Sequence, residues 1–375
     1  MNNSNYKDAL EKIIKEVVEP MAAEIDQTGS FPRPALAALG EAGLLGLITA
    51  TEVGGLGQGH RAAAFVVERL AAACASTAMV ACMHYAGAAV IEAHGTRTTR
   101  EAIAKGKHLT TLAFSEIGSR SHFWTPLGTA AKSYDGIYLN AQKSWVTSAG
   151  QADSYVWSSR ALANDGAITI WQAPTDAQGL QIPAPFDGLG LRGNFSSPVK
   201  AENVLISTEA MLGADGGGFD IMMGVVLPYF QIMSAAFSVG TMEATTSKSI
   251  QHVTNTRFEY SKQSLADLPT VRAYLSRMRI KTDATRALLL DALDALEQGR
   301  EDAMLRVLEV KAAAGEASVE VTDLAMRICG GAAFRKEVGI ERHFRDARAA
   351  LVMAPTSDAL YDFIGKALCQ MPLFE

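Results

Sequence analysis

Hydrophobic and polar positions recur with two different periods along this chain, and the change of period divides it into three parts. From Tyr6 to about Lys107 apolar residues return every three or four positions, which is the spacing of one helix face. Between Leu109 and about Gly213 the period shortens to that of strands. Long helical patterns return from Gly218 onward. We therefore predict a helical domain over 1–108, a β domain over 109–215 and a helical bundle over 216–375.

The middle part contains six predicted strands that follow one another without intervening helices. Turn pairs such as Asp135-Gly136 separate several of them, as hairpins require. Parallel strands need long crossover connections, so this arrangement favours an antiparallel barrel or sandwich within an α+β protein. The predicted strands cover 109–114, 128–133, 136–142, 154–160, 167–172 and 199–205.

The two flanking parts are predicted to be helical throughout. In the N-terminal part an alanine-rich run from Ala62 to His94 follows a glycine-rich turn. In the C-terminal part four patterns are long enough to form a four-helix bundle, and Pro269 stands where one of them would begin. These four patterns cover 219–257, 268–298, 301–328 and 357–368.

Composition narrows the classes of function. Hydrophobic residues make up 48% and charged residues 20% of the 375 positions, as in a folded protein with more than one core. A net charge of -6 disfavours a nucleic-acid partner. The four cysteines and seven histidines lack metal-ligand spacing, so no metal site is expected. The first residues lack a signal core and no run approaches the ~18 apolar residues of a membrane span, so we expect a cytoplasmic protein with no membrane partner.

A glycine pattern at Gly188-Leu189-Gly190-Leu191-Arg192-Gly193 matches G-x-G-x-x-G. A dinucleotide site of that kind needs a strand before the glycines and a helix after them. Here Pro183-Ala184-Pro185 precedes and a strand-like segment follows. We interpret the pattern as a turn of the β domain.

Three motifs carry more specific information because of their order. They are the segment from Phe114 to Ser121, the segment Lys143-Ser144-Trp145-Val146-Thr147, and a C-terminal series of Gly330-Gly331, Glu341–Arg348 and Met353–Thr356. In this order they resemble the acyl-CoA dehydrogenase flavoproteins over essentially the whole chain. The resemblance implies FAD as cofactor, an acyl thioester as substrate, and a homotetramer or homodimer.

The resemblance also implies which residues contact FAD. Arg257 stands where the family places an arginine that contacts the FAD pyrophosphate. Gly330 and Gly331 stand where the family's backbone approaches the FAD of a neighbouring subunit. Thr356 matches a threonine near the adenosine half. The isoalloxazine ring would be lined by Phe114, Ser115, Ser121, Trp145 and Thr147.

One expected residue is missing. In the usual reaction of the family a glutamate removes the substrate's α-proton while the β-hydrogen leaves as hydride. At that position this chain has Ala354. Some members carry the glutamate instead on the helix that here contains Leu227–Gln231, which offers neither an acid nor an arginine. Because that segment often holds CoA, its composition favours an acyl group on a carrier protein, or a different small substrate.

Three residues are candidates for a replacement proton acceptor: His84, Tyr229 and Asp358. A histidine titrates near neutral pH, but His84 lies on an alanine-rich helix where a packed structural histidine is the more common case. A tyrosine titrates too high to serve as a base without a large perturbation. The catalytic residue is therefore left open.

Four functions remain compatible with this sequence. The first is a non-standard acyl-CoA dehydrogenase homologue that oxidises an acyl thioester. The family also contains enzymes that eliminate or cyclise without net oxidation, and flavin monooxygenases, all of which need that glutamate less. The fourth is a flavin-binding protein that has lost catalysis.

Overall fold

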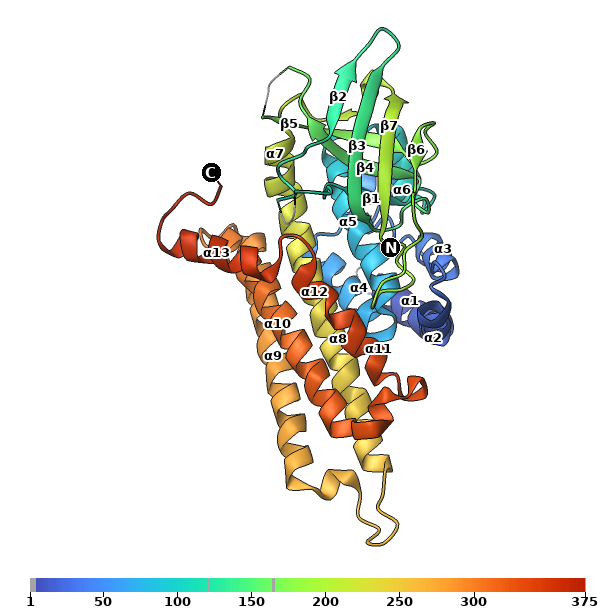
Figure 1. Cartoon of the computed structure of the whole chain (residues 1–375), viewed down its shortest axis with the longest axis vertical. Helices are drawn as coiled ribbons and strands as arrows, with labels where there is room; N and C mark the ends of the chain where they lie inside the picture. The colour runs from blue at the N-terminus through green and yellow to red at the C-terminus, as the bar shows by residue number, and fades with distance from the viewer. Residues whose placement is uncertain (1–4, 120–121, 164–165, 375) are drawn as a thin grey trace. The chain divides into compact units, whose positions relative to one another are not determined.

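The computed structural model describes residues 5–119, 122–163 and 166–374 (Figure 1). Contacts divide the chain into two compact units. The first takes in the chain up to Val66, together with Ser76–Gly188 and Arg192–Phe230. The second consists of Val67–Ala75, Leu189–Leu191 and the chain from Gln231 onward.

The N-terminal part is helical, as predicted. Its elements are α1 (Asn5–Ile13), a π-helical turn η1 (Ile14–Val18), α2 (Glu19–Thr28), α3 (Arg33–Glu41), a 3₁₀ turn η2 (Thr51–Val53), α4 (His60–Ala73), α5 (Ala75–His94) and α6 (Arg97–Ala104). Helix α2 ends at Gly29, whose φ of 68° is readily adopted only by glycine. The alanine-rich run predicted as one helix is in fact two, because helical structure is interrupted at Cys74.

The β domain of the first unit consists of two four-stranded sheets. One has the order β1-β4-β5-β8 and the other β2-β3-β7-β6. The strands are β1 (Thr110–Ala113), β2 (Thr129–Lys132), β3 (Ile137–Val146), β4 (Ser154–Arg160), β5 (Ile168–Pro174), β6 (Leu180–Gln181), β7 (Ser197–Ile206) and β8 (Met211–Leu212). All six predicted strands are present, while the two-residue strands β6 and β8 were missed.

The expectation of purely antiparallel pairing needs one correction. Strand β1 pairs with β4 in parallel, with Thr110 opposite Ser154. The other pairs between these strands are antiparallel. The parallel pair arises because β2 and β3, which lie between β1 and β4 in sequence, belong to the other sheet. They form a crossover long enough to bring the chain back in the same direction.

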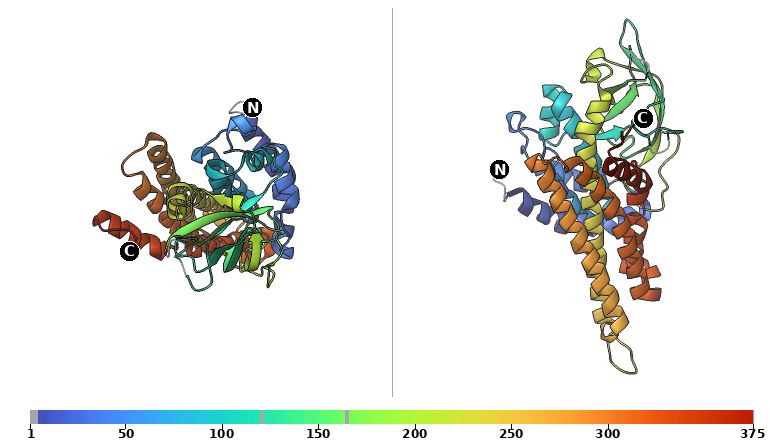
Figure 2. Two further views of the ribbon diagram at one scale, coloured as in Figure 1. Left: turned by 90° about the horizontal axis from the view of Figure 1, so that it is seen from above. Right: turned by 90° about the vertical axis from the view of Figure 1, so that its left-hand side faces the viewer.

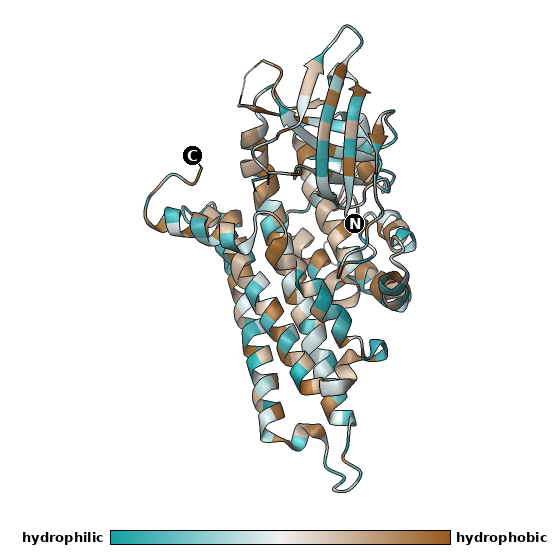
Figure 3. Cartoon of the chain, viewed as in Figure 1, coloured by the Kyte–Doolittle hydropathy of each residue, from teal (hydrophilic) through white to brown (hydrophobic). Residues whose placement is uncertain are grey.

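The core of the β domain is formed by buried residues from both sheets. Strand β4 is buried along nearly its whole length, whereas β3 has buried positions interspersed with partly exposed ones. Hydrophobic and hydrophilic residues are likewise mixed along β3 in Figure 3. Trp157 and Trp171 face each other across β4 and β5 and are fully buried. The Trp171 indole N–H donates to Ser159 Oγ at 2.8 Å, which satisfies its only polar atom.

The C-terminal part is dominated by three long helices, α8 (Leu227–Asn255), α9 (Pro269–Gln298) and α10 (Ala303–Cys329), with the 3₁₀ turn η5 (Leu265–Asp267) before α9. Helices α9 and α10 run side by side and are joined by a short turn (Figures 1 and 2). The predicted start at Pro269 is correct. Helix α8 is preceded by α7 (Gly218–Ile221) and the π turn η4 (Met222–Val226), and α10 is followed by η6 (Gly330–Phe334), η7 (Lys336–Val338), α11 (Ile340–Ala347), α12 (Ala349–Val352) and α13 (Ser357–Leu368).

One helical stretch, Gly218–Asn255, is long and apolar enough to cross a membrane, with a mean hydropathy of 1.5. The sequence-based expectation that no segment reaches this length was therefore wrong. Within the protein, however, 78% of its apolar window is buried. A core helix has the same composition as a membrane span, so the finding is weak evidence for a membrane.

Candidate functional site

Two of the predicted flavin-contacting segments lie side by side in the first unit. The N–H of Ser144 donates to the carbonyl of Ser115 at 2.9 Å, and the N–H of Ile117 donates to that of Gln142 at 3.1 Å. The chain after β1 is therefore joined to the last residues of β3. Phe114 and Ser115 are thus brought close to the segment that carries Trp145.

Trp145 has two unusual properties for a strand residue. Its φ of 56° lies in the left-handed region, and its side chain is 70% exposed. It sits where the β3–β7 register shifts, between Lys143 and Val146, and such a bulge re-aims a side chain. A large aromatic held outward at a conformational cost is typical of a binding surface.

The remaining predicted flavin residues differ in their surroundings. Phe114 is buried, and the Thr147 hydroxyl is 3.0 Å from Ser196 Oγ. Next to it, Ser148 is also buried and its Oγ has no hydrogen-bond partner among the described atoms. Ser121 lies outside the described residues, so its predicted contact with flavin stays a prediction.

A buried ion pair, which sequence reasoning missed, fixes these segments to one another. Lys143 Nζ lies 2.6 Å from Glu116 Oε1, and Lys143 is 0% and Glu116 4% exposed. Glu116 Oε2 also accepts the backbone N–H groups of Leu127 and Gly128, at 2.6 and 2.8 Å. There is no room for a side chain at residue 128, because its Cβ would lie 2.9 Å from Glu116 Oε1.

On the other side of the pair, Lys143 donates to two atoms of Ser158 on β4. The distances are 2.7 Å to the carbonyl and 3.0 Å to Oγ. Burial lowers the pKa of Lys143 to about 8, although the nearby Glu116 carboxylate opposes this shift. We take the pair to be ionised, because besides its own short contact four hydrogen bonds to neighbouring groups satisfy it. The two motifs predicted to contact flavin are therefore joined through charged side chains to the core of the sheet.

Arg257 lies in the connection between α8, which ends at Asn255, and α9, which begins at Pro269. Its side chain is exposed and donates to the Lys262 carbonyl at 3.1 Å, within the same connection. The structure thus leaves it accessible to another molecule. Its predicted role at the FAD pyrophosphate stays a prediction.

Gly330 and Gly331 follow the end of α10. Gly330 has φ 55° and ψ -137°, a conformation that other residues do not readily adopt. A Cβ on either glycine would meet none of the described atoms within 4 Å. Packing within the chain therefore does not demand the second glycine, and both leave open space.

Ala354 is partly buried in the turn between α12 and α13. The hydroxyl of Thr356 accepts the N–H of Ala359 at 3.3 Å and so caps α13. From α10, Lys311 Nζ donates to the carbonyls of Met353 and Pro355, at 2.9 and 2.6 Å. Sequence reasoning missed Lys311, although its neighbours on the same helix face, Val307, Leu308, Ala314 and Gly315, are all apolar and so indicate a buried lysine.

His84 is fully buried, and both of its ring nitrogens are engaged by backbone. Nε2 lies 2.9 Å from the Leu45 carbonyl, and Nδ1 accepts the Thr110 N–H at 3.2 Å. Burial lowers the pKa of His84 to about 4. This geometry describes a structural histidine and gives no support to His84 as a proton acceptor.

Tyr229 and Asp358 gain no support either. The Tyr229 ring stacks on His60, with centroids 3.9 Å apart, and burial raises the pKa of Tyr229. A raised pKa makes the phenolate rarer at neutral pH. Asp358 is exposed in the first turn of α13, where a carboxylate stabilises the helix end.

The glycine pattern at 188–193 is a loop, as interpreted from the sequence, and no helix follows it. Its glycine at position 190 packs on α11, since a Cβ there would lie 2.7 Å from the carbonyl of Arg345. The adjacent Leu191 N–H donates to Asp346 Oδ1 at 2.7 Å. Close backbone packing therefore accounts for glycine at position 190.

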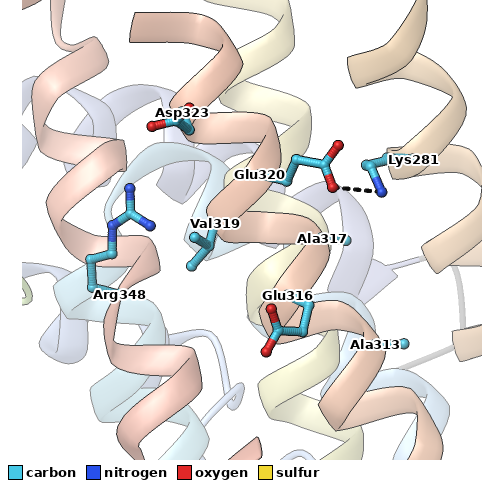
Figure 4. Close-up of a pocket in the computed structure, with 8 residues that line it drawn as sticks. All are labelled: Lys281, Ala313, Glu316, Ala317, Val319, Glu320, Asp323 and Arg348. Atoms are coloured by element: carbon cyan, nitrogen blue, oxygen red, sulfur yellow. Dashed lines mark ion pairs between the residues drawn. The ribbon is translucent and has the colours of Figure 1, made fainter.

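A surface pocket of about 370 Å³ in the second unit contains none of the predicted site residues. It lies along α9 and α10 and presents three carboxylates, of Glu316, Glu320 and Asp323, with the cations Lys281 and Arg348 (Figure 4). Lys281 and Glu320 face each other across it at 2.7 Å. Among the residues that the structure describes, no group of three or more His, Cys, Asp or Glu could hold a metal ion.

Three family profiles match consecutive parts of the chain. They are described as the N-terminal, middle and C-terminal domains of acyl-CoA dehydrogenases and match residues 2–106, 111–204 and 216–369. The chain is 27% identical over 360 residues to "Probable acyl-CoA dehydrogenase YngJ" of Bacillus subtilis, covering 94% of each protein.

Solved structures show the same fold. Butyryl-CoA dehydrogenase from Megasphaera elsdenii has a TM-score of 0.91 at 23% identity, covering 98% of this chain and 99% of the other. The prolyl acyl carrier protein oxidase AnaB gives 0.87 at 22% (98% and 100%), and an FAD complex of PigA gives 0.89 at 18% (98% of each). The predicted fold class, helical then β then helical, is confirmed. The chain belongs to the acyl-CoA dehydrogenase family of flavoenzymes.

Proposed function

We propose that this chain is an FAD-dependent oxidoreductase that acts on an acyl thioester, held by CoA or by a carrier protein, without a carboxylate at residue 354. The observation that carries the proposal is a contrast within the chain. The segments assigned to flavin are held together by a buried ion pair, whereas the residue assigned to the α-proton is Ala354.

The residues of the flavin segments fit the proposed cofactor. Trp145 offers an exposed indole wall, and the buried Ser148 Oγ lacks a partner within the described chain, as expected beside a bound polar group. In the second unit the exposed Arg257 suits a pyrophosphate. When bound, FAD supplies a two-electron acceptor. The chain's own contribution is to orient that acceptor and the substrate.

The surroundings of the two glycines after α10 support assembly of the protein into an oligomer. Gly330 and Gly331 have open space around them, which suits the approach of a neighbouring subunit. We propose a homotetramer or homodimer located in the cytoplasm. Light scattering of the FAD-loaded protein would test the assembly, and a monomer would contradict it.

The substrate carrier is argued from helix α8. Gln231 is fully buried, and neither its amide oxygen nor its amide nitrogen has a partner among the described residues. The segment Leu227–Gln231 thus presents a neutral amide and no charged group to any ligand that reaches it. A carrier-protein thioester lacks the CoA nucleotide and needs fewer such charges. AnaB, by its name, acts on a prolyl acyl carrier protein.

None of the three candidate bases is supported by its surroundings in the structure. His84 is committed to backbone bonds, and Tyr229 is less acidic than an ordinary tyrosine. A reaction that does not depend on a strong base at residue 354 is therefore favoured. Elimination or cyclisation without net oxidation remains the second candidate, supported by the same alanine.

The test is an anaerobic mixing experiment with the FAD-loaded protein and two matched panels of acyl groups, one on CoA and one on a carrier protein. Bleaching of the flavin supports oxidation, and faster bleaching with carrier thioesters supports the carrier assignment. Product formation without bleaching supports elimination or cyclisation. Oxygen-dependent hydroxylation after prior reduction would identify a monooxygenase instead. Binding of FAD with no turnover in either panel would contradict an enzymatic function on acyl thioesters.

A further inference from the structure

Lys311 on α10 ends between the two peptide carbonyls that bracket Ala354. Its Nζ donates to Met353 O at 2.9 Å and to Pro355 O at 2.6 Å. The residue is 1% exposed. Placing a lysine in such surroundings is costly unless its donors are used. Both contacts go to the backbone of one turn, so the geometry is specific to that turn.

The two bonds are compatible with either protonation state of the amine. Desolvation lowers the pKa of Lys311 to about 7. An ammonium has three N–H donors, and a neutral amine still has two. Both carbonyls can therefore be held at neutral pH whether or not the proton is present. The contact acts as a fixed clamp and not as a pH switch.

Other contacts complete the frame around residue 354. The Met353 N–H donates to Ala349 O at 3.0 Å, which ends α12, and Thr356 caps α13. One helical turn beyond Lys311, a Cβ on Gly315 would lie 3.4 Å from Ala350 O. Helix α10 thus lies close against the segment on both sides of Ala354.

We propose that Lys311 is a positioning residue for residue 354: its side chain fixes the backbone on both sides of that position, so any side chain placed there is presented in one orientation. The proposal rests on the proposed function in one respect only: residue 354 is taken as the position from which a side chain would reach the substrate's α-carbon. The consequence is that the change to alanine removed the carboxylate but left the frame that would hold one.

The first experiment measures the frame without using activity. We would follow hydrogen exchange in the FAD-loaded protein at three amides that flank residue 354. The Met353 N–H is bonded at the end of α12, and the Ala359 and Leu360 N–H groups are bonded at the start of α13. We expect Lys311→Met to accelerate exchange at these amides about tenfold or more, and Lys311→Arg, which keeps N–H donors, to restore most of the protection. Lys281→Met is the matched control, since Lys281 is a partly exposed lysine paired with Glu320.

Unchanged exchange in a folded Lys311→Met protein would overturn the proposal. If that variant does not fold, Lys311→Arg decides: protection supports the proposal, and lost protection at an unchanged melting temperature contradicts it. Failure of both variants to fold, while Lys281→Met folds, would make Lys311 a general folding residue and would also overturn it.

The second experiment places a carboxylate on the frame. In an Ala354→Glu background, adding Lys311→Met should slow flavin bleaching by an acyl-CoA about tenfold at saturating substrate, with little change in KM, because the carboxylate is no longer held in one orientation. Adding Lys311→Arg should preserve the rate. Equal rates in all three proteins would overturn the proposal. If Ala354→Glu alone does not bleach, the proposed function of residue 354 is contradicted, whereas the exchange result still judges Lys311.

Discussion

At the residue scale, the functional surface depends on charged side chains that are hidden from solvent. Glu116 and Lys143 stand inside two of the motifs that are predicted to contact flavin, yet neither was assigned a role from the sequence. A motif shows which residues occur together but not which of them face inward. The exposed Trp145 and the buried Lys143 are two positions apart on one strand, and a bulge between them decides their directions. Such a bulge has no reliable sequence signal.

Removing Lys143 should be costly. In Lys143→Met the Glu116 carboxylate stays buried without its cation, which typically costs ~3–5 kcal/mol. We expect urea unfolding to show a loss of this size, with weaker retention of FAD. The double variant Glu116→Gln with Lys143→Met should lose less than the single one. Lys200→Met is the control, because the Lys200–Glu202 pair is largely exposed and is worth under ~1 kcal/mol. Equal losses at Lys143 and Lys200 would contradict a buried ionised pair.

Gln231 should respond in the opposite direction. Its amide is buried without a partner, and an unsatisfied buried polar group costs ~1–3 kcal/mol. Gln231→Met should therefore raise the free energy of unfolding of the ligand-free protein by up to about that amount. If Gln231 binds substrate, the same variant should raise KM. A loss of stability would show that the amide has a partner within the folded chain.

At the element scale, the change of period and the turn pairs between segments predicted the long helices and all six longer strands. It could not predict that β1 and β4 are parallel, since this depends on which sheet β2 and β3 join. It also missed β6 and β8, which are too short to show a period. Likewise, the burial of α8 follows from neighbours that the sequence does not reveal.

Close helix packing in the second unit gives a prediction at this scale. Gly240 on α8 lies against α4, where an added Cβ would be 2.1 Å from the Glu68 carbonyl. Gly240→Ala should therefore force the helices apart and cost ~1–3 kcal/mol or more. Gly365→Ala on α13 is the control, because a Cβ there meets none of the described atoms within 4 Å. The Gly365→Ala change should raise the free energy of unfolding by up to ~1 kcal/mol. Thermal melting would distinguish them, and similar shifts would contradict the close approach.

At the scale of the whole molecule, buried neutral histidines set the acid limit of stability. Burial lowers the pKa of His84 to about 4, and also lowers the pKa values of His108 and His343. Between 6.5 and about 4 the unfolded chain binds protons that the folded chain does not, so stability falls as pH falls. His84 alone should contribute a slope of ~1.4 kcal/mol per pH unit.

Urea midpoints measured from pH 7 downward would show this slope. His84→Gln keeps one donor and one acceptor but does not titrate, so its profile should be flatter than that of the wild type. A wild-type profile that is flat across this window, or identical slopes in both proteins, would indicate that His84 is protonated in the folded state.

The family and the fold could both be predicted from the sequence, because they depend on motifs in a fixed order. The assignment of residue 354 to the family's usual acid stays a prediction. The substrate could not be predicted, since no motif of the chain specifies the acyl group. The most direct test of the central claim is the anaerobic rate of flavin bleaching by an acyl-CoA in the FAD-loaded wild type and in Ala354→Glu. We predict that the wild type bleaches slowly or not at all and that Ala354→Glu bleaches at least tenfold faster. A tenfold faster rate corresponds to an activation barrier lower by about 1.4 kcal/mol. A bleaching rate that Ala354→Glu leaves unchanged, with FAD retained, would contradict the assignment of residue 354 to the substrate's α-proton.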